Sequence, residues 1–246
     1  MSIPPRAIFF DLDETLIENR HSIASLFDET FKQFDTQLGE HKRDTFFSAL
    51  GQHAKGLWDT MFEHDISPEK QFTNCFEQSI ISTESVSKTD AAILANSMFE
   101  HFTHLSSNNV TLHHDSLSTL AELRQQGLVT GIITNGIEEL QLGKIYKLGL
   151  QNRVDHIIVS AQARAHKPKQ EVFDLALSKA KVDANQAWQI GDHATNDVAG
   201  AIRAGMQGVF YNPNQHEIAE SFATLLERPS HVISNLSEVI KLVTQD

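Results

Sequence analysis

From residue 128 onward, short apolar runs alternate with segments of helical periodicity. Strands that alternate with helices in this way form a parallel sheet covered by helices. A further apolar run near the N-terminus supplies a first strand. We therefore expect an α/β fold with a central parallel sheet of five or six strands. The predicted strands are residues 7–11, 128–134, 155–160, 186–191, 207–211 and, more weakly, 231–233.

Glycine residues mark the ends of three helices expected between these strands. Apolar residues at helical spacing precede Gly127, Gly149 and Gly205. Glycine is the preferred residue for the left-handed conformation that commonly follows a helix. Another apolar face, over residues 172–180, indicates a further helix.

Residues 20 to about 108 have a different, helical pattern. Apolar residues follow helical spacing over 23–38 and 94–105, and Ser67-Pro68-Glu69 is typical of a helix start. No strand-like run interrupts them. We expect a core domain of residues 1–18 and 109–246, with a helical domain of residues 19–108 inserted after the first strand. The polar connections at 17–20 and 106–114 should be exposed.

The first predicted strand ends at two carboxylates, Asp11 and Asp13. Anions beside a buried strand are costly unless a cation or a chemical role compensates them. Because side chains alternate along a strand, Asp11 and Asp13 should share one side while Leu12 packs inside. Two such carboxylates suit Mg²⁺, which protein carboxylates and substrate phosphates commonly bind together. A strand end with two solvated acids is the alternative.

Polar residues also stand where the later strands end. Thr134 and Asn135 end the second strand, Lys167 follows the third, and Asp192 ends the fourth with Asp197 five residues later. Each segment alone is an ordinary turn, surface lysine or helix cap. In an open parallel sheet, however, the carboxyl ends of the strands form the ligand crevice. The set therefore predicts a site for an anionic oxygen substrate held through a divalent cation.

Composition excludes several other classes of function. The formal net charge of -12 argues against binding to nucleic acid or to an anionic membrane, because both require a positive surface. No apolar run approaches the ~20 residues of a membrane span. The single cysteine, Cys75, excludes an internal disulfide, and we expect a cytoplasmic protein. The thirteen histidines are scattered without cysteine partners, which argues against a zinc site.

Four segments together resemble the ordered motifs of the haloacid dehalogenase superfamily of hydrolases. The resemblance covers residues 7–18 and about 111–212, and it implies a Rossmann-like three-layer core whose first strand is central. It also implies that the helical insertion is a C1-type cap. The segments are Asp-Leu-Asp-Glu-Thr (11–15), Ile-Thr-Asn-Gly (133–136), His-Lys-Pro-Lys (166–169) and Gly-Asp-His-Ala-Thr-Asn-Asp (191–197).

By this resemblance, Asp11 is the nucleophile that becomes an aspartyl phosphate. Asp13 is the acid that protonates the leaving oxygen and the base that later activates water. Thr134, the backbone N–H of Asn135 and the Lys167 ammonium would hold the phosphoryl oxygens.

The same resemblance implies a Mg²⁺ site formed by Asp192, the Asp11 side chain and the Asp13 carbonyl. Asp197 would orient the groups around the metal. Two residues depart from the usual pattern: Glu14 stands where glycine is most usual, and His193 stands where a small residue is common.

Asp13 also distinguishes branches of this superfamily, because the dehalogenases proper have an aromatic residue there and need no Mg²⁺. The chain therefore resembles a phosphatase of a small soluble phosphomonoester, similar to bacterial pyrimidine nucleotidases and flavin-pathway phosphatases. A nucleoside monophosphate or a sugar phosphate is the expected substrate. A phosphosugar mutase and a noncatalytic phosphate-binding module remain alternatives, and a phosphonate-cleaving enzyme would need a cap lysine that nothing singles out. The sequence specifies no oligomeric state.

Overall fold

The protein is described by a computed structural model that covers residues 4–215 and 217–244. The chain divides into two compact units. One unit contains the chain up to Asn19, Val110–Gln141 and the chain from Ile145 onward. The other contains Arg20–Asn109 and Leu142–Lys144.

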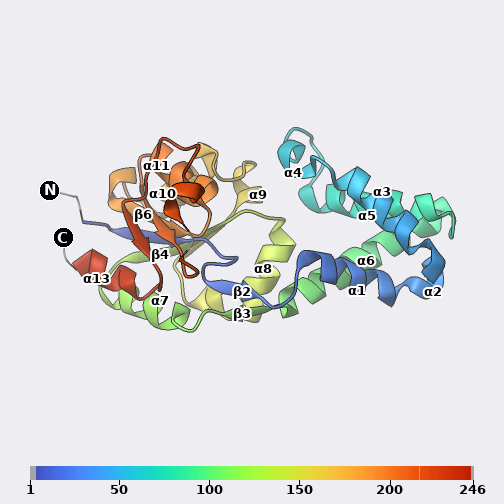
Figure 1. The fold of residues 1–246 in the computed structure, drawn as a ribbon, viewed down its shortest axis with the longest axis horizontal. Coiled ribbons are helices and arrows are strands. Elements are labelled where there is room, and N and C mark those ends of the chain that lie inside the picture. The colour runs from blue at the N-terminus through green and yellow to red at the C-terminus, as the bar shows by residue number, and fades with distance from the viewer. Residues whose placement is uncertain (1–3, 216, 245–246) are drawn as a thin grey trace. The chain divides into compact units, whose positions relative to one another are not determined.

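A six-stranded parallel sheet forms the centre of the first unit, in the order β5-β4-β1-β6-β7-β8 (Figure 1). The first strand lies inside the sheet, paired with β4 on one side and β6 on the other. The predicted parallel sheet is confirmed. Its strands are β1 (Ala7–Phe10), β4 (Val129–Thr134), β5 (His156–Val159), β6 (Ala187–Gly191), β7 (Gln207–Tyr211) and β8 (His231–Ile233).

Helices cover both faces of this sheet, which gives the predicted three layers. Helices α7 (Ser116–Gln125) and α13 (Glu238–Thr244) pack together on one face (Figure 1). On the other face, α10 (Gln170–Ala180) packs on β4 and β5, and α11 (Gly200–Arg203) contacts β7. This unit also contains α9 (Ser160–Ala163), α12 (Ile218–Ser221) and α8 (Glu138–Lys147), except for residues 142–144 of α8, which belong to the other unit.

Strand β1 is buried in the core along its whole length. All four of its side chains are fully buried, and the backbone N–H of Asp11 donates to the Ile190 carbonyl at 2.8 Å. On the neighbouring strand, a Cβ atom at Gly131 would lie 2.6 Å from the Phe9 ring, so only glycine fits there. This packing fixes the place where the chain leaves the sheet.

The expected helix ends are also confirmed. Gly127, Gly149 and Gly205 have φ values of +81°, +69° and +82°, the left-handed conformation predicted for them.

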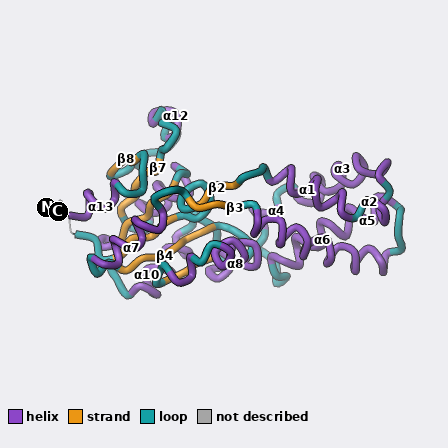
Figure 2. Tube along the Cα trace, turned by 90° about the horizontal axis from the view of Figure 1, so that it is seen from below, coloured by secondary structure: helices purple, strands orange, loops and turns teal. Residues whose placement is uncertain are grey.

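The second unit is entirely helical (Figure 2). As predicted, Ser67 caps the helix that begins at Pro68, its hydroxyl accepting from the Lys70 backbone N–H. Phenylalanine rings fill its core, with the Phe27 and Phe102 centroids 4.6 Å apart. The helices are α1 (Ile23–Gln33), α2 (Asp35–Leu38), α3 (Arg43–Ala54), α4 (Leu57–Thr60), α5 (Pro68–Thr83) and α6 (Lys88–Asn108).

Two short strands that the sequence did not predict stand where the helical insertion begins and ends. Strands β2 (Ile17–Asn19) and β3 (Val110–Leu112) pair antiparallel, with Asn19 opposite Val110 (Figure 2). The first connection is exposed as expected over residues 18–20, although Ile17 is buried. In the second, Ser106, Asn109 and Val110 are buried, so the expectation that it is exposed was wrong. Three-residue strands are too short to show a periodicity, and this pairing joins segments far apart in the sequence.

None of the helices that the structure describes is long and apolar enough to cross a membrane. Cys75 is a free thiol buried in α5.

Candidate active site

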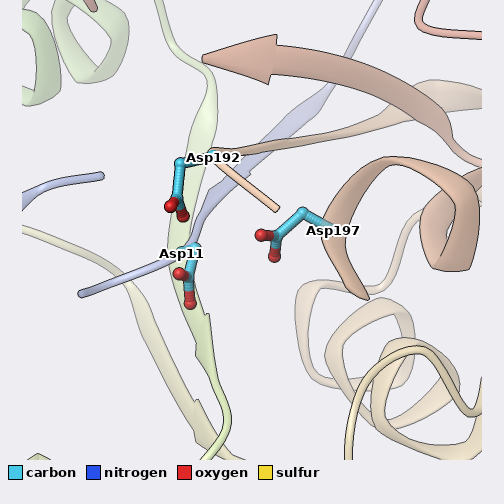
Figure 3. Close-up of side chains that lie close together, drawn as sticks. All are labelled: Asp11, Asp192 and Asp197. Atoms are coloured by element: carbon cyan, nitrogen blue, oxygen red, sulfur yellow. The ribbon is translucent and has the colours of Figure 1, made fainter. Parts of the chain in front are cut away.

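Three carboxylates meet at the carboxyl edge of the sheet (Figure 3). Asp11 follows β1, Asp192 follows β6, and Asp197 lies in the π-helical turn Ala194–Ala199. One oxygen from each of the three carboxylates lies within 4.8 Å of the other two. Within residues 4–215 and 217–244, no other group of three or more His, Cys, Asp or Glu side chains converges in this way. The adjacent ends of β1 and β6 explain why residues so far apart in sequence meet here.

The ammonium group of Lys167 lies among these carboxylates. Its Nζ donates to Asp11 Oδ1 at 2.7 Å, to Asp197 Oδ1 at 2.5 Å and to the Ile133 carbonyl at 2.8 Å. The side chain is 2% exposed, so these bonds replace water. The two carboxylates hold the pKa of Lys167 above its ordinary value despite burial, which keeps the amine charged.

The site carries more negative than positive charge. Burial raises the pKa of Asp11, with a further contribution from the charge of Asp197, while Lys167 opposes the rise. Burial, followed by the charge of Asp197, raises the pKa of Asp192 to about 6. Both shifts mean that the ionised carboxylates lack sufficient compensation from the protein. Hard oxygen ligands with excess negative charge fit a divalent cation such as Mg²⁺, whose charge would reverse both shifts.

Asp197 is the most firmly held of the three carboxylates. Its Oδ1 also accepts from Gln189 Nε2 at 3.1 Å, and its Oδ2 accepts from the His193 backbone N–H at 3.2 Å. The side chain of Asp197 is 1% exposed, whereas that of Asp11 is 13% exposed. A side chain at Gly191 would collide with the Asp197 carboxylate, so glycine here leaves room for it.

Gln141, which sequence analysis missed, links Asp13 to Thr134. Its Nε2 donates to Asp13 Oδ2 at 2.9 Å and to Thr134 Oγ1 at 2.5 Å. Gln141 is 3% exposed although it lies on α8, where a lone glutamine in a helix gives no sequence signal of burial. A Cβ atom at Gly136 would collide with the Gln141 side chain, which crosses this turn. Asp13 Oδ1 accepts in addition from Asn19 Nδ2 at 3.1 Å.

The Asn135 side chain holds the loop that carries Lys167. Its Oδ1 accepts from the Lys167 backbone N–H at 2.7 Å, and its Nδ2 donates to the Lys167 carbonyl at 3.0 Å. The turn that contains Asn135 and Gly136 is held by Ser160, whose Oγ accepts from the Gly136 backbone N–H at 3.0 Å. Ser160 Oγ also lies 2.8 Å from Nδ1 of His166, whose pKa burial lowers to about 4. The ring of His166 is therefore neutral at pH 7, and its Nδ1 can accept from the serine hydroxyl.

The two unusual residues have structural explanations. Glu14 has a φ of +58°, the left-handed conformation in which glycine is favoured. Its carboxylate accepts from the backbone N–H and the side-chain amide of Asn19 at 3.2 and 3.0 Å. His193 caps the following turn, its Nδ1 accepting from the backbone N–H groups of Thr195 and Asn196, each at 3.2 Å.

The structure thus brings together every residue that the sequence singled out. Asp11, Lys167 and Asp197 share one set of hydrogen bonds, and Asp13 and Thr134 share another through Gln141. Asp192 joins the first set through the carboxylate cluster, and its backbone N–H donates to Thr15 Oγ1 at 3.2 Å. The arrangement combines a carboxylate bonded to a buried ammonium, a second carboxylate two residues later, a hydroxyl group, and oxygen ligands of the kind that a divalent ion prefers.

Comparison with known proteins agrees with this geometry. Residues 8–211 match the family model for haloacid dehalogenase-like hydrolases. The chain is 30% identical to a ribulose-1,5-bisphosphate 5-phosphatase from Halopiger xanaduensis, over 97% of this chain and 99% of the relative. It is 25% identical to a glyceraldehyde 3-phosphate phosphatase from Pyrococcus furiosus, over 98% of this chain and 94% of the relative.

A solved structure gives the same result. A 2-haloacid dehalogenase from Pseudomonas syringae pv. Tomato DC3000 superimposes with a TM-score of 0.79 at 25% identity, over 98% of this chain and 99% of the other. The family match contains all four motif segments and most of the chain. From the motifs, the sheet order and this match, the chain belongs to the haloacid dehalogenase-like hydrolases.

Proposed function

We propose that this hydrolase is a Mg²⁺-dependent phosphatase that acts on a small phosphomonoester, a sugar phosphate or a nucleoside monophosphate. The observation that carries the proposal is the position of the Lys167 ammonium, which joins Asp11 to Asp197 at the edge where Asp13 and Thr134 also meet. This is an arrangement for attack by a carboxylate on an anionic centre. The phosphatase names of the two relatives support the same chemistry.

The likeness to a dehalogenase makes halide displacement the competing activity. Asp13 favours phosphate ester hydrolysis, because an alkoxide leaving group needs a proton and a halide does not. The carboxylate of Asp13 is held by Gln141 and Asn19 on the same edge as Asp11, where a leaving oxygen would stand.

In the proposed reaction an oxygen of Asp11 attacks phosphorus, and the bond between phosphorus and the substrate alcohol breaks. Asp13 gives its proton to the departing oxygen. In the second half, Asp13 takes a proton from water, and that water attacks phosphorus, releasing inorganic phosphate and the Asp11 carboxylate. Asp13 ends protonated, as it began.

The remaining residues stabilise the phosphoryl group. When Asp11 attacks, its negative charge passes to the phosphoryl oxygens. The Lys167 ammonium, which is bonded to Asp11 before the attack, is close enough to stabilise that charge on the phosphoryl group. Thr134 and the backbone N–H of Asn135 would donate to the other oxygens. Asp11, Asp192 and the Asp13 carbonyl would hold the Mg²⁺ ion, with Asp197 fixing the groups around it. When bound, the ion shields the repulsion between carboxylate and phosphate and polarises the ester.

Removal of the metal tests this proposal. The purified protein should release phosphate from p-nitrophenyl phosphate with Mg²⁺, lose that activity in EDTA and regain it when Mg²⁺ is restored. Asp192→Asn should raise the Mg²⁺ concentration for half-maximal rate by about tenfold or more, because it removes a charged ligand. Asp174→Asn, at an exposed position on α10, is the matched control. Activity that persists in EDTA would contradict the metal requirement.

Gln141→Leu tests the hydrogen bonds between Asp13 and Thr134. We expect kcat to fall on the order of tenfold to 100-fold, since the acid is no longer positioned. The loss should be greater for an alkyl phosphate such as glycerol 3-phosphate than for p-nitrophenyl phosphate, whose weakly basic leaving group needs less proton transfer. Gln126→Leu, an exposed glutamine, is the control. Equal losses on both substrates would assign Gln141 a structural role only.

A further inference from the structure

A cleft of about 560 Å³ opens in the first unit directly beside the carboxylate cluster. Asp192 belongs both to the cluster and to the wall of the cleft. Glu14 and Asn19 also line it, and Asn19 donates to Asp13, the proposed acid. The cleft therefore begins where the leaving oxygen of a bound phosphomonoester would stand.

The charged residues of this cleft are acidic. Glu14, Glu18 and Asp192 line it, and no lysine or arginine is among its lining residues in the part of the chain that the structure describes. His113 pairs with Glu18, with Nδ1 and Oε1 2.9 Å apart. With Asp192 balanced by a bound cation, a ligand carrying a second negative group would still meet the carboxylates of Glu14 and Glu18, which costs binding energy.

The other groups in the cleft suit an uncharged hydroxylated ligand. Tyr211, at the end of β7, is 4% exposed, and its hydroxyl has no hydrogen-bond partner within residues 4–215 and 217–244. Burial, with Asp115 and Glu18 nearby, raises the pKa of Tyr211 to about 12, so the phenol remains a donor. The His113 ring packs edge-on against it, with centroids 5.6 Å apart. Asn214 and Asn235 add amide donors and acceptors.

Resting on the proposed function, we propose that this cleft binds the alcohol portion of the substrate and selects an uncharged, hydroxylated group. Sugar, polyol or nucleoside monophosphates would then be substrates. Esters whose alcohol carries a carboxylate or a second phosphate would be rejected by Glu18 and its acidic neighbours. Tyr211 would donate to, or accept from, a substrate hydroxyl.

Matched substrates test this selection. Fructose 6-phosphate and fructose 1,6-bisphosphate differ by one phosphate, and 2-hydroxyethyl phosphate and 2-phosphoglycolate differ by one carboxylate. With Mg²⁺ present, kcat/KM should favour the uncharged member of each pair by about tenfold or more, because like charges are brought close together. p-Nitrophenyl phosphate serves as the common reference.

Two variants test whether residues of the cleft cause this substrate preference. Glu18→Gln should narrow the preference for fructose 6-phosphate over the bisphosphate by about threefold or more, since it removes one negative charge. Tyr211→Phe should raise KM for fructose 6-phosphate about fivefold more than KM for p-nitrophenyl phosphate, which has no hydroxyl to bind. Glu171→Gln and Tyr146→Phe, both at exposed side chains, are the matched controls.

The outcomes separate this inference from the proposed function. Equal or higher kcat/KM for the charged substrates, in a protein that hydrolyses p-nitrophenyl phosphate, overturns the inference and leaves the phosphatase standing. A preference that neither variant changes also overturns it, because the cleft would then not be its origin. If the protein released phosphate from none of the esters, both the inference and the proposed phosphatase function would be contradicted. If Tyr211→Phe does not fold, Glu18→Gln decides, because its side chain is 54% exposed.

Discussion

Asp11→Asn is expected to abolish phosphate release, with a loss on the order of 10⁴-fold or more in kcat for p-nitrophenyl phosphate. An amide oxygen is a poor nucleophile and carries no charge to balance Lys167. The fold should remain, because the amide has nearly the shape of the carboxylate and Lys167 keeps its bond to Asp197. Acid-quenched wild-type protein should carry a covalent phosphoryl group on the peptide containing Asp11, detected by mass spectrometry.

The variant must lack that phosphoryl group while its circular dichroism matches the wild type. Asp174→Asn, the exposed aspartate on α10, should keep both the activity and the label. Substantial turnover by Asp11→Asn, or a label on another residue, would show that the nucleophile has been misassigned.

Lys167→Met should have the second large effect, on stability as well as on activity. The ammonium is buried between two carboxylates, and its removal leaves both without their shared counter-charge. Breaking a buried ion pair from one side costs about 3 to 5 kcal/mol, so the free energy of unfolding in urea should fall by that amount. Lys179→Met, on the exposed face of α10, should change the free energy of unfolding little.

The stability loss in Lys167→Met should depend on pH in a definite direction. Burial already raises the pKa of Asp11 and Lys167 opposes that rise, so the variant should have a still higher pKa at Asp11. A carboxyl whose pKa is higher in the folded than in the unfolded state stabilises the fold at low pH and loses this contribution as pH rises. With Lys167 present the pKa of Asp11 is raised to about 8, so below that pH the carboxyl is protonated in both folded proteins. The deficit should therefore stay nearly constant below about pH 8 and grow as the pH rises above it. A deficit that grows on acidification would contradict this.

The convergence of Asp11, Lys167, Asp192 and Asp197 was predictable from sequence because it follows from the order of strands. Each residue comes just after a strand or in the loop that follows one, and parallel strands place their carboxyl ends along one edge. Short apolar runs bounded by glycine and polar residues were sufficient to find those strands.

The supporting residues were not predictable, because their roles depend on tertiary contacts. Gln141 is one polar residue on a helix, and only the fold shows that it lies buried between Asp13 and Thr134. The cleft could not be predicted for the same reason. His113 and Tyr211, which line it, are distant in sequence and come into contact only once β3 and β7 have formed. A pattern of hydrophobicity in one sequence does not encode such pairs.

The pairing of β2 with β3 has a consequence for how this protein can change over evolution. Asn19 pairs with Val110, so the helical insertion of residues 20–109 begins and ends at adjacent positions of one two-stranded sheet. A short β-turn would be enough to join these two positions directly. The insertion can therefore become longer or shorter, or be replaced, without a change in β1 or β4. Mutation can thus change the inserted helices while the aspartates and the lysine at the edge of the sheet keep their positions.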